Sequence, residues 1–207
     1  MEKYVCLSFD DGPNIEGDNT MSNMLDVLEK HNVVASFFLI GNKINEKNKD
    51  VILRAYNMGC DIQNHSWSHP FMSKLSKEQM KEEFDKCENE IVKITGKNSQ
   101  FFRPPYIDVN EELFSVIPNP FICGHGVEDW VAEVTAEQRF ERMMESVKDG
   151  TIFLLHVMEK NDATVQAVDR LIVELKKQGY TFVNLPDLFI KEGVDPKQPN
   201  AMWTFLK

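Results

Sequence analysis

Two adjacent aspartates, Asp10 and Asp11, follow the first apolar run of the chain and are themselves followed by Gly12 and Pro13. Successive side chains on a strand point to opposite faces. Both carboxylates therefore reach one pocket only if the extended run ends near Phe9, which the Gly-Pro pair favours. One aspartate could then bind a metal ion while the other acts as a base. A solvated turn explains this motif equally well, so the metal hypothesis depends on finding further ligands.

A second motif places His65 and His69 at positions i and i+4, directly before Pro70. In a helical turn these two positions lie on the same face, and Pro70 disfavours helical geometry at His69, so the turn should end there. Two neutral imidazoles and one carboxylate form the ligand set of a catalytic zinc site, which keeps positions open for water and substrate. Asp11 is the candidate for the third ligand. A pair of surface or capping histidines is the alternative interpretation.

Arg103 lies in a short apolar segment that ends in a Pro-Pro pair, where its side chain can be held in a fixed direction. A guanidinium group is a permanent donor fork for a carboxylate. Arg103 could therefore pair with Asp10 and orient it. The alternative, an ordinary surface arginine, is disfavoured by the apolar and proline neighbours.

The apolar run 152–157 contains one ionisable residue, His156, near its end. A single histidine in such a run is more often a core residue, but its place at the end of a predicted strand favours a role in the site. Asp129 and Trp130 follow the apolar run 121–123. They could supply an acid that tunes His156 and an indole that walls the pocket.

Strand-like apolar runs alternate with helix-like segments along the chain, which predicts parallel pairing. Every candidate functional residue lies at the end of a strand-like run, where barrels of parallel strands place their active sites. We therefore predict an α/β fold, a distorted, incomplete (β/α) barrel that forms one domain over residues 1–207. The predicted strands are 5–9, 34–39, 60–63, 101–103, 121–123, 152–156 and 181–184, and the predicted helices are 20–31, 49–58, 77–95, 136–148 and 164–178. Ser76 and Gln79 fit a capping box before the longest helix.

In this order, five motifs resemble those of the polysaccharide deacetylases, carbohydrate esterase family four, whose catalytic unit is the NodB-homology domain. The motifs are Ser-Phe-Asp-Asp-Gly-Pro, His-Ser-x-x-His, Arg-Pro-Pro-Tyr, Glu-Asp-Trp and Leu-Leu-His. Phe-Phe-Arg-Pro-Pro and the Asp-Gly-Thr-Ile segment at 149–152 resemble the bacterial acetyl-xylan-esterase-like branch most. The resemblance implies the same barrel and a hydrolase that removes acetyl groups from O-acetyl xylan or from N-acetylglucosamine polymers.

The resemblance also implies a role for each of ten residues. The implied metal ligands are Asp11, His65 and His69. The implied catalytic residues are Asp10 as base, Arg103 as the residue that positions it, His156 as general acid and Asp129 as the acid that tunes it. The implied substrate contacts are the Tyr106 backbone N–H as an oxyanion donor, with Leu154 and Trp130 around the acetyl methyl. Gly126 and Val157 stand where many family members carry further acids.

The expected reaction is attack of water on an acetyl ester or amide. Asp10 would take a proton from that water, and His156, as imidazolium, would protonate the departing oxygen or nitrogen. The expected cofactor is a divalent metal. Zinc is the default, and cobalt or nickel are alternatives, because sites of nitrogen and oxygen ligands follow affinity order and availability.

A net charge of −10 and a pI near 5.0 disfavour nucleic acid and anionic membranes as partners. An acetylated polysaccharide or oligosaccharide is compatible with this charge, and we expect a monomer. Because Met1-Glu2-Lys3 leads directly into the first predicted strand, we expect no signal peptide or transmembrane run before it, unless the chain is a module of a secreted parent. The four cysteines lack Cys-x-x-Cys spacing and are predicted to be free thiols, which favours a cytoplasmic location. A polymeric substrate favours an extracellular or cell-surface location, to which we give slightly more weight.

Two other classes of protein fit parts of the pattern. A non-haem iron oxygenase also uses two histidines and one carboxylate, but its commonest scaffold is all-β, and it has no evident use for Arg103 and Asp10. A non-catalytic carbohydrate-binding domain on a deacetylase scaffold is the second alternative. The complete set of candidate residues argues against such a loss of activity.

Overall fold

A parallel sheet of six strands forms the centre of the molecule in the computed structural model, which describes residues 2–207. The strand order is β3-β2-β1-β6-β5, and β7 pairs with the first residues of β1. All of these pairs are parallel, as the alternation of strand and helix predicted. The bounds are β1 (Lys3–Gly12), β2 (Ser36–Leu39), β3 (Asp61–Asn64), β5 (His125–Gly126), β6 (Thr151–His156) and β7 (Tyr180–Phe182).

The sheet curves into an incomplete barrel, and beyond β3 its wall continues only through single β-bridges. Phe102 forms single bridges to Asn64, at the end of β3, and to Phe121 in β4 (Phe121–Ile122). β5 follows β4 after two residues and pairs with β6, so the ring of strands is interrupted between β4 and β5. β8 (Met202–Trp203), from the C-terminal tail, pairs with β4. The predicted distorted, incomplete (β/α) barrel is confirmed.

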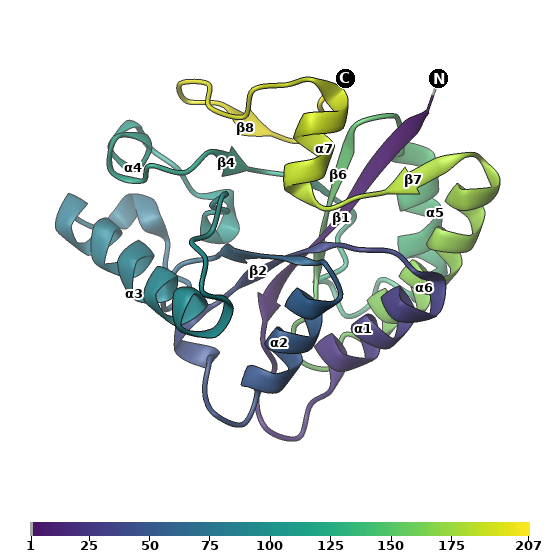
Figure 1. Cartoon of the computed structure of the whole chain (residues 1–207), viewed down its shortest axis with the longest axis horizontal. Coiled ribbons are helices and arrows are strands. Elements are labelled where there is room, and N and C mark those ends of the chain that lie inside the picture. The colour runs from purple at the N-terminus through teal and green to yellow at the C-terminus, as the bar shows by residue number, and fades with distance from the viewer. Residues whose placement is uncertain (1) are drawn as a thin grey trace.

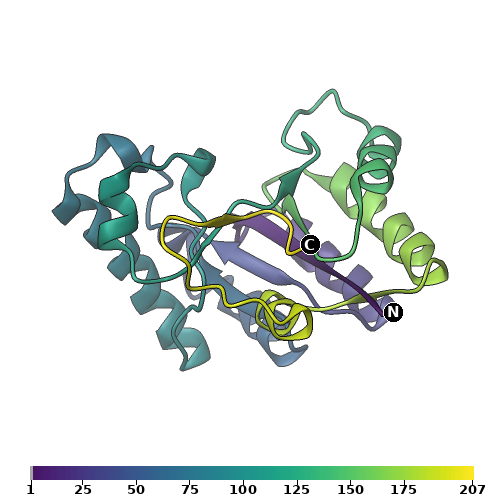
Figure 2. The ribbon, with the colours of Figure 1, turned by 90° about the horizontal axis from the view of Figure 1, so that it is seen from above.

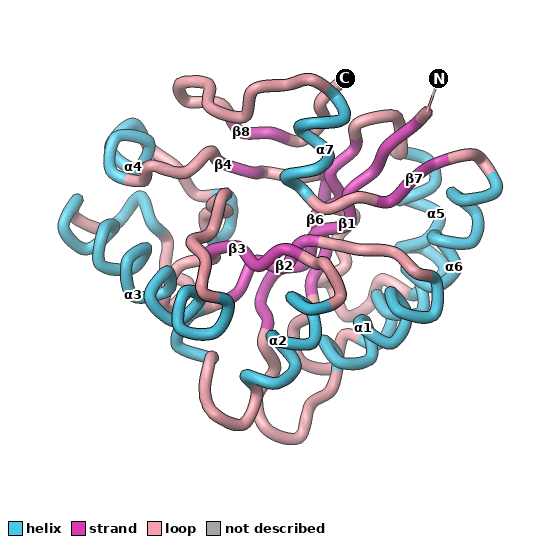
Figure 3. The backbone as a smooth tube through the Cα atoms, viewed as in Figure 1, coloured by secondary structure: helices cyan, strands magenta, loops and turns pink. Residues whose placement is uncertain are grey.

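Helices surround the sheet in the order α5, α6, α1, α2, α3 and α4, each in contact with the next (Figures 1 and 2). Figure 3 shows these helices at the left, below and at the right of the central strands, with α7 (Leu185–Glu192) and β8 above them. α7 instead packs at the end of the barrel where β1 begins. Its Leu185, Leu188 and Phe189 join the interior apolar cluster. The other bounds are α1 (Thr20–His31), α2 (Lys49–Asn57), α3 (Lys77–Thr95), α4 (Glu111–Val116), α5 (Ala136–Ser146) and α6 (Asp162–Lys177). Among residues 2–207, no helix combines the length and apolarity that a membrane crossing requires.

Alternation along β1 separates the two sides of the barrel wall. Val5, Leu7 and Phe9 belong to the large apolar cluster beneath the helices, whereas Tyr4 and Cys6 belong to the cluster inside the barrel. Both faces of β1 are buried, which explains why this strand is a nearly continuous apolar run. By the same alternation, Ser8 and Asp10 lie on the interior side. The first candidate catalytic residue is therefore directed into the barrel, at the end of its central strand.

All five predicted helices are present, and α3 has the bounds and the Ser76–Gln79 capping box that were predicted. The tail packs back through β8, and Phe205 bridges Thr151. The strand predicted at 101–103 is wrong, because only Phe102 pairs and two prolines without N–H donors follow Arg103. α4, α7 and β5 were not predicted, since such short segments carry too few residues to show periodicity. All four cysteines are free thiols, in agreement with the prediction.

Candidate active site

Asp10 and Asp11 reach one pocket by a different route from the one that the sequence predicted. β1 does not stop at Phe9 but continues to Gly12, and its register with β2 shifts between these two residues. Asp11 has a φ of 72°, a left-handed conformation that aspartate adopts more readily than most residues. Such an irregularity redirects a side chain that regular pleating would send to the opposite face. Both carboxylates therefore line the same pocket.

His65 and His69 lie in the loop after β3, and the predicted helical turn is wrong. Ser66 and His69 have φ values of 67° and 60°, which no helical turn contains. The ligand loop, residues 65–69, folds back on itself and brings the two imidazole centroids to 5.0 Å. Pro70 remains consistent with this geometry, because it disfavours the right-handed helical region at His69.

Glu83 on α3 binds the ligand loop with its carboxylate. One oxygen accepts the backbone N–H groups of Trp67, at 3.0 Å, and Ser68, at 2.7 Å, and the other accepts the Ser68 hydroxyl at 2.7 Å. The Trp67 indole packs on Gly41, where a Cβ would lie only 2.7 Å from the ring. The loop is therefore held to α3 and to the segment after β2.

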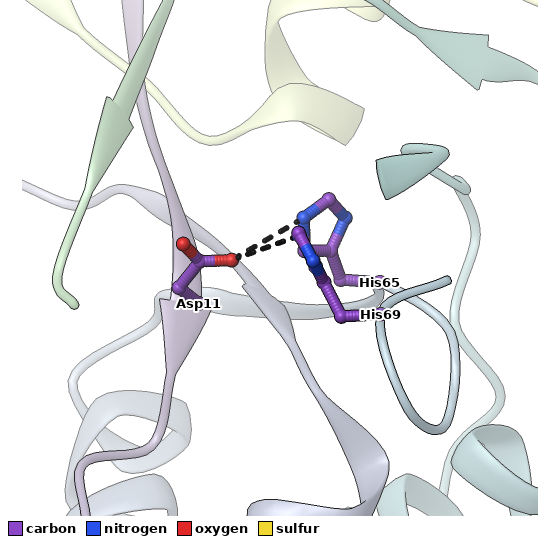
Figure 4. Close-up of side chains that lie close together, drawn as sticks. All are labelled: Asp11, His65 and His69. Atoms are coloured by element: carbon purple, nitrogen blue, oxygen red, sulfur yellow. Dashed lines mark ion pairs between the residues drawn. The ribbon is translucent and has the colours of Figure 1, made fainter. Parts of the chain in front are cut away.

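Three ligand atoms converge between β1 and the ligand loop (Figure 4). Asp11 Oδ1 lies 3.3 Å from His69 Nε2 and 3.6 Å from His65 Nε2. A tetrahedral ion with ligands at about 2.0–2.2 Å separates its ligand atoms by roughly 3.3–3.6 Å. His65 Nδ1 donates to the Arg103 carbonyl at 2.6 Å, which leaves Nε2 as the nitrogen that could bind a metal. The spacing and the tautomer both fit one divalent ion.

The Asp11 carboxylate has the properties of a cation ligand. Burial raises its pKa, but the neighbouring His69, His65 and His156 outweigh burial and hold the pKa well below its usual range. Its Oδ1 is buried and has no hydrogen-bond partner within residues 2–207. A buried, ionised oxygen that accepts no hydrogen bond is costly unless a ligand satisfies it. These observations fit a site for a metal ion.

Asp10 forms a buried ion pair with Arg103 beside the three ligand atoms. The guanidinium donates to Asp10 Oδ1 at 2.5 Å and to the Ser8 hydroxyl at 2.7 Å. Its carbon lies 4.2 Å from the centroid of the Phe38 ring, and the arginine side chain is fully buried. Gly124 leaves room for it, because a Cβ there would lie 2.8 Å from the guanidinium. This packing fixes the direction of the Asp10 carboxylate.

His156 pairs with Asp129 on the other side of the pocket. The Asp129 carboxylate accepts the His156 backbone N–H at 2.7 Å, binds Nδ1 at 2.8 Å and accepts the Thr164 hydroxyl at 2.9 Å. Burial lowers the pKa of His156, but the bond to Asp129 and the nearby carboxylates outweigh burial and raise it to about 9. The imidazole is thus charged at neutral pH, and its Nε2 remains available.

The pocket formed by these groups has a volume of about 380 Å³. Eight of the ten predicted site residues line it, while Arg103 and Asp129 lie buried behind Asp10 and His156. The Trp130 ring stands edge-on to His156 at 5.4 Å, and Leu154 and Tyr106 complete the wall. A larger hollow of about 880 Å³ lies between the segments 14–22 and 45–51, which include the first residues of α1 and α2. None of its lining residues is a histidine or an arginine. The ionisable groups that line the smaller pocket therefore make it the candidate active site.

Residues 1–118, more than half of the chain, match the family model described as polysaccharide deacetylase. The chain belongs to the polysaccharide deacetylase family. This membership confirms the prediction from the five motifs. The α/β barrel also disfavours the iron oxygenase alternative, whose commonest scaffold is all-β.

Three relatives of this family member support the xylan-esterase-like branch. A bifunctional xylanase/deacetylase of Pseudobutyrivibrio xylanivorans is 40% identical over 100% of this chain, which spans only 34% of that protein. The Xyl-CE4 domain of a multidomain xylanase from the hindgut metagenome of Trinervitermes trinervoides is 38% identical, with a TM-score of 0.95 over 100% of this chain and 98% of that one. A family 4 acetyl xylan esterase from Clostridium thermocellum, in complex with a cobalt ion, is 38% identical, with a TM-score of 0.92 over 98% of each chain.

Gly126, where many polysaccharide deacetylases carry a further acid, has a packing reason in this chain. A Cβ on Gly126 would lie 3.1 Å from the Trp130 ring. A side chain at this position would require the indole to shift by a few tenths of an ångström. Among residues 2–207, the carboxylate that is hydrogen-bonded to the His156 imidazole is that of Asp129.

Several residues that support the site were not predicted from the sequence. Ser8 carried a signal, since it is a polar residue on the Asp10 side of an apolar strand. Arg139 is buried and donates to Thr164 at 2.8 Å, behind Asp129. Arg139 and Glu83 both belong to helices rich in charged residues, where nothing in the local pattern separates a supporting residue from a solvated one.

Proposed function

We propose that this domain is a metal-dependent hydrolase that removes acetyl groups from a polysaccharide or oligosaccharide. The proposal rests on one arrangement: a three-residue metal site flanked by an oriented carboxylate and by a charged imidazole in one pocket. An acid, a base and a cation site are the groups that metal-assisted hydrolysis of an acyl group uses. The non-catalytic alternative has no use for this combination.

Asp11, His65 and His69 would hold the ion, for which zinc is the default and cobalt or nickel are alternatives. When bound, such an ion supplies Lewis acidity, which lowers the pKa of water and polarises an acyl carbonyl. The Asp11 Oδ1, which accepts no hydrogen bond from residues 2–207 and faces both imidazoles, supports this assignment. The cobalt ion in the Clostridium thermocellum structure is consistent with it.

The remaining residues would handle protons, charge and the acetyl group. Asp10, oriented by Arg103, takes a proton from the attacking water, and His156 Nε2 donates a proton to the departing oxygen or nitrogen. The Tyr106 N–H makes no hydrogen bond to residues 2–207 and can donate to the developing oxyanion. Trp130 and Leu154 would enclose the acetyl methyl.

Acetylated xylan is the first candidate substrate, because the names of the relatives refer to xylanases and an acetyl xylan esterase. N-acetylglucosamine polymers are the second candidate. The same residues serve both, since an ester and an acetamide differ only in the leaving atom that His156 protonates.

The direct test is acetate release from acetylated xylan and from N-acetylated chitooligosaccharides. The protein is stripped of metal with a chelator and then loaded separately with zinc, cobalt or nickel. We expect acetate from at least one substrate after loading and none from the stripped protein. A loaded protein that releases acetate from neither would contradict the proposal and leave a carbohydrate-binding domain as the interpretation.

Glu83→Gln is expected to weaken zinc binding by about 10- to 100-fold, the usual cost of losing a group that positions metal ligands. A neutral amide has one acceptor oxygen and cannot replace three carboxylate contacts to the ligand loop. The measurement is zinc titration by calorimetry. Glu82→Gln is the matched control, since Glu82 is the exposed neighbour on the same helix. Equal affinities for the two variants would exclude a positioning role for Glu83.

A further inference from the structure

Three large aromatic side chains are exposed among residues 2–207, and all three lie at or beside the candidate active site. Their exposed fractions are 53% for Phe71, 57% for Tyr106 and 47% for Trp130. Single exposed apolar residues are ordinary, but a cluster beside a pocket indicates a binding surface. Tyr106 and Trp130 were already candidates for contacting the acetyl group, whereas Phe71 has no role so far.

Phe71 extends a row of rings that begins at the metal site. Tyr106 stands edge-on to His69 with centroids 4.6 Å apart, and Phe71 stacks on Tyr106 at 4.2 Å with an interplanar angle of 15°. We call Phe71 and Tyr106 the aromatic platform. It lies on the His69 side of the pocket, and Trp130 lies on the His156 side.

The platform is fixed in place without a ligand. Asp108, two residues after Tyr106, accepts the Ser73 backbone N–H at 2.7 Å and the Ser73 hydroxyl at 2.8 Å. This clamp joins the segment that carries Phe71 to the segment that carries Tyr106. Met72, the next residue, is fully buried, which anchors the segment while Phe71 points outward. A surface that is ordered before binding loses little conformational entropy when a ligand arrives.

We propose that the aromatic platform binds a sugar ring adjacent to the one that is deacetylated. This inference rests on the proposed function. A pocket of about 380 Å³ is small for a polymer, so the neighbouring sugars must pass over its rim. The C–H groups on one face of a pyranose are weakly positive and apolar, and they suit the negative face of an aromatic ring. Phe71 would therefore contribute to recognition of long substrates without touching the reacting atoms.

The test compares a long substrate with a small one. We expect Phe71→Ala to lower kcat/KM on acetylated xylan by about 2- to 12-fold, the factor for one aromatic contact, mainly through KM. Hydrolysis of 4-nitrophenyl acetate, which has no neighbouring sugar, should keep the wild-type rate. Phe71→Tyr should retain activity on xylan, and Phe71→Leu should behave like Phe71→Ala. If the wild type prefers chitooligosaccharides, a hexamer and the monosaccharide replace the two substrates.

Ile190→Ala is the matched control, because Ile190 is an exposed apolar residue on α7, at the other end of the barrel. Several outcomes would overturn the platform. These are equal losses on both substrates, unchanged kinetics on the long substrate, a Phe71→Leu variant as active as the wild type, or a dimer in sedimentation that Phe71→Ala dissociates. A wild-type protein that releases no acetate at all would instead refute the proposed function, so the two failures can be distinguished.

Discussion

Asp10→Asn is expected to lower kcat for acetate release by about 10²- to 10⁴-fold, the range for removal of a general base. An asparagine preserves the shape of the side chain and can still accept the Arg103 bond that Asp10 Oδ1 receives. It cannot take a proton from water at neutral pH. Because the lost interaction belongs to the transition state, kcat and kcat/KM should fall together.

A measurement of zinc affinity can show whether Asp10 is a metal ligand, as proposed for Asp11, or only a base. Asp10 Oδ2 lies 3.6 Å from His65 Nε2, close enough for Asp10 to compete as a ligand. Calorimetric titration of Asp10→Asn with zinc should give nearly the wild-type affinity if Asp10 is only a base. Loss of zinc would make Asp10 a ligand, and wild-type turnover would remove it from the mechanism.

Asp61→Asn is a suitable control for placing an amide in the barrel. Asp61 is the first residue of β3, at the end of the strand away from His65, and burial raises its pKa to about 6. We expect this variant to keep turnover near the wild-type value. A similar loss in both variants would indicate general damage to the barrel and would leave the Asp10 result without catalytic meaning.

The alternation of strands and helices along the chain and the polar residues at the strand ends could be predicted from the sequence, because both follow from local patterns. The continuous apolar run of β1 reflects burial on both faces, and the capping box of α3 involves only neighbouring residues. The residues that line the pocket could be selected as candidates because Asp10, His65 and His156 are ionisable groups at the ends of apolar runs. Such positions are rare enough to be recognised without a structure.

The local geometry of the site could not be predicted, since it depends on contacts between distant segments. The left-handed φ of Asp11 accompanies a shift of register against β2, and the loop from His65 to His69 is shaped by its bonds to Glu83 on α3. Helical spacing selected two histidines that the structure does bring together, although the segment that carries them is not helical. Phe71 was missed because its sequence neighbours do not reveal that its ring stacks on Tyr106.

Asp129→Asn is expected to move the alkaline limb of the pH profile to lower pH. The general acid must be protonated, so activity is present below the pKa of His156 and is lost above it. With Asp129 that pKa is raised to about 9 from the usual 6.5. Part of this increase comes from Asp10 and Asp11, which a bound cation would offset, so the wild-type limb should fall near or somewhat below pH 9.

Removal of the Asp129 charge takes away its contribution to the raised pKa of His156, while burial continues to lower that pKa. At pH 8.5 we expect Asp129→Asn to be about 10- to 100-fold less active than the wild type on acetylated sugars, because the protonated fraction falls roughly tenfold per unit of pKa. Nitrophenolate leaves without a proton, so hydrolysis of 4-nitrophenyl acetate should lose far less. The control is Asp162→Asn, which changes an exposed aspartate at the start of α6 and should keep the wild-type profile.

An alkaline limb that stays in place in Asp129→Asn would mean that another group donates the proton. An equal loss on both substrates, with no shift in pH, would reduce Asp129 to a structural residue that holds β6 against α6 through Thr164.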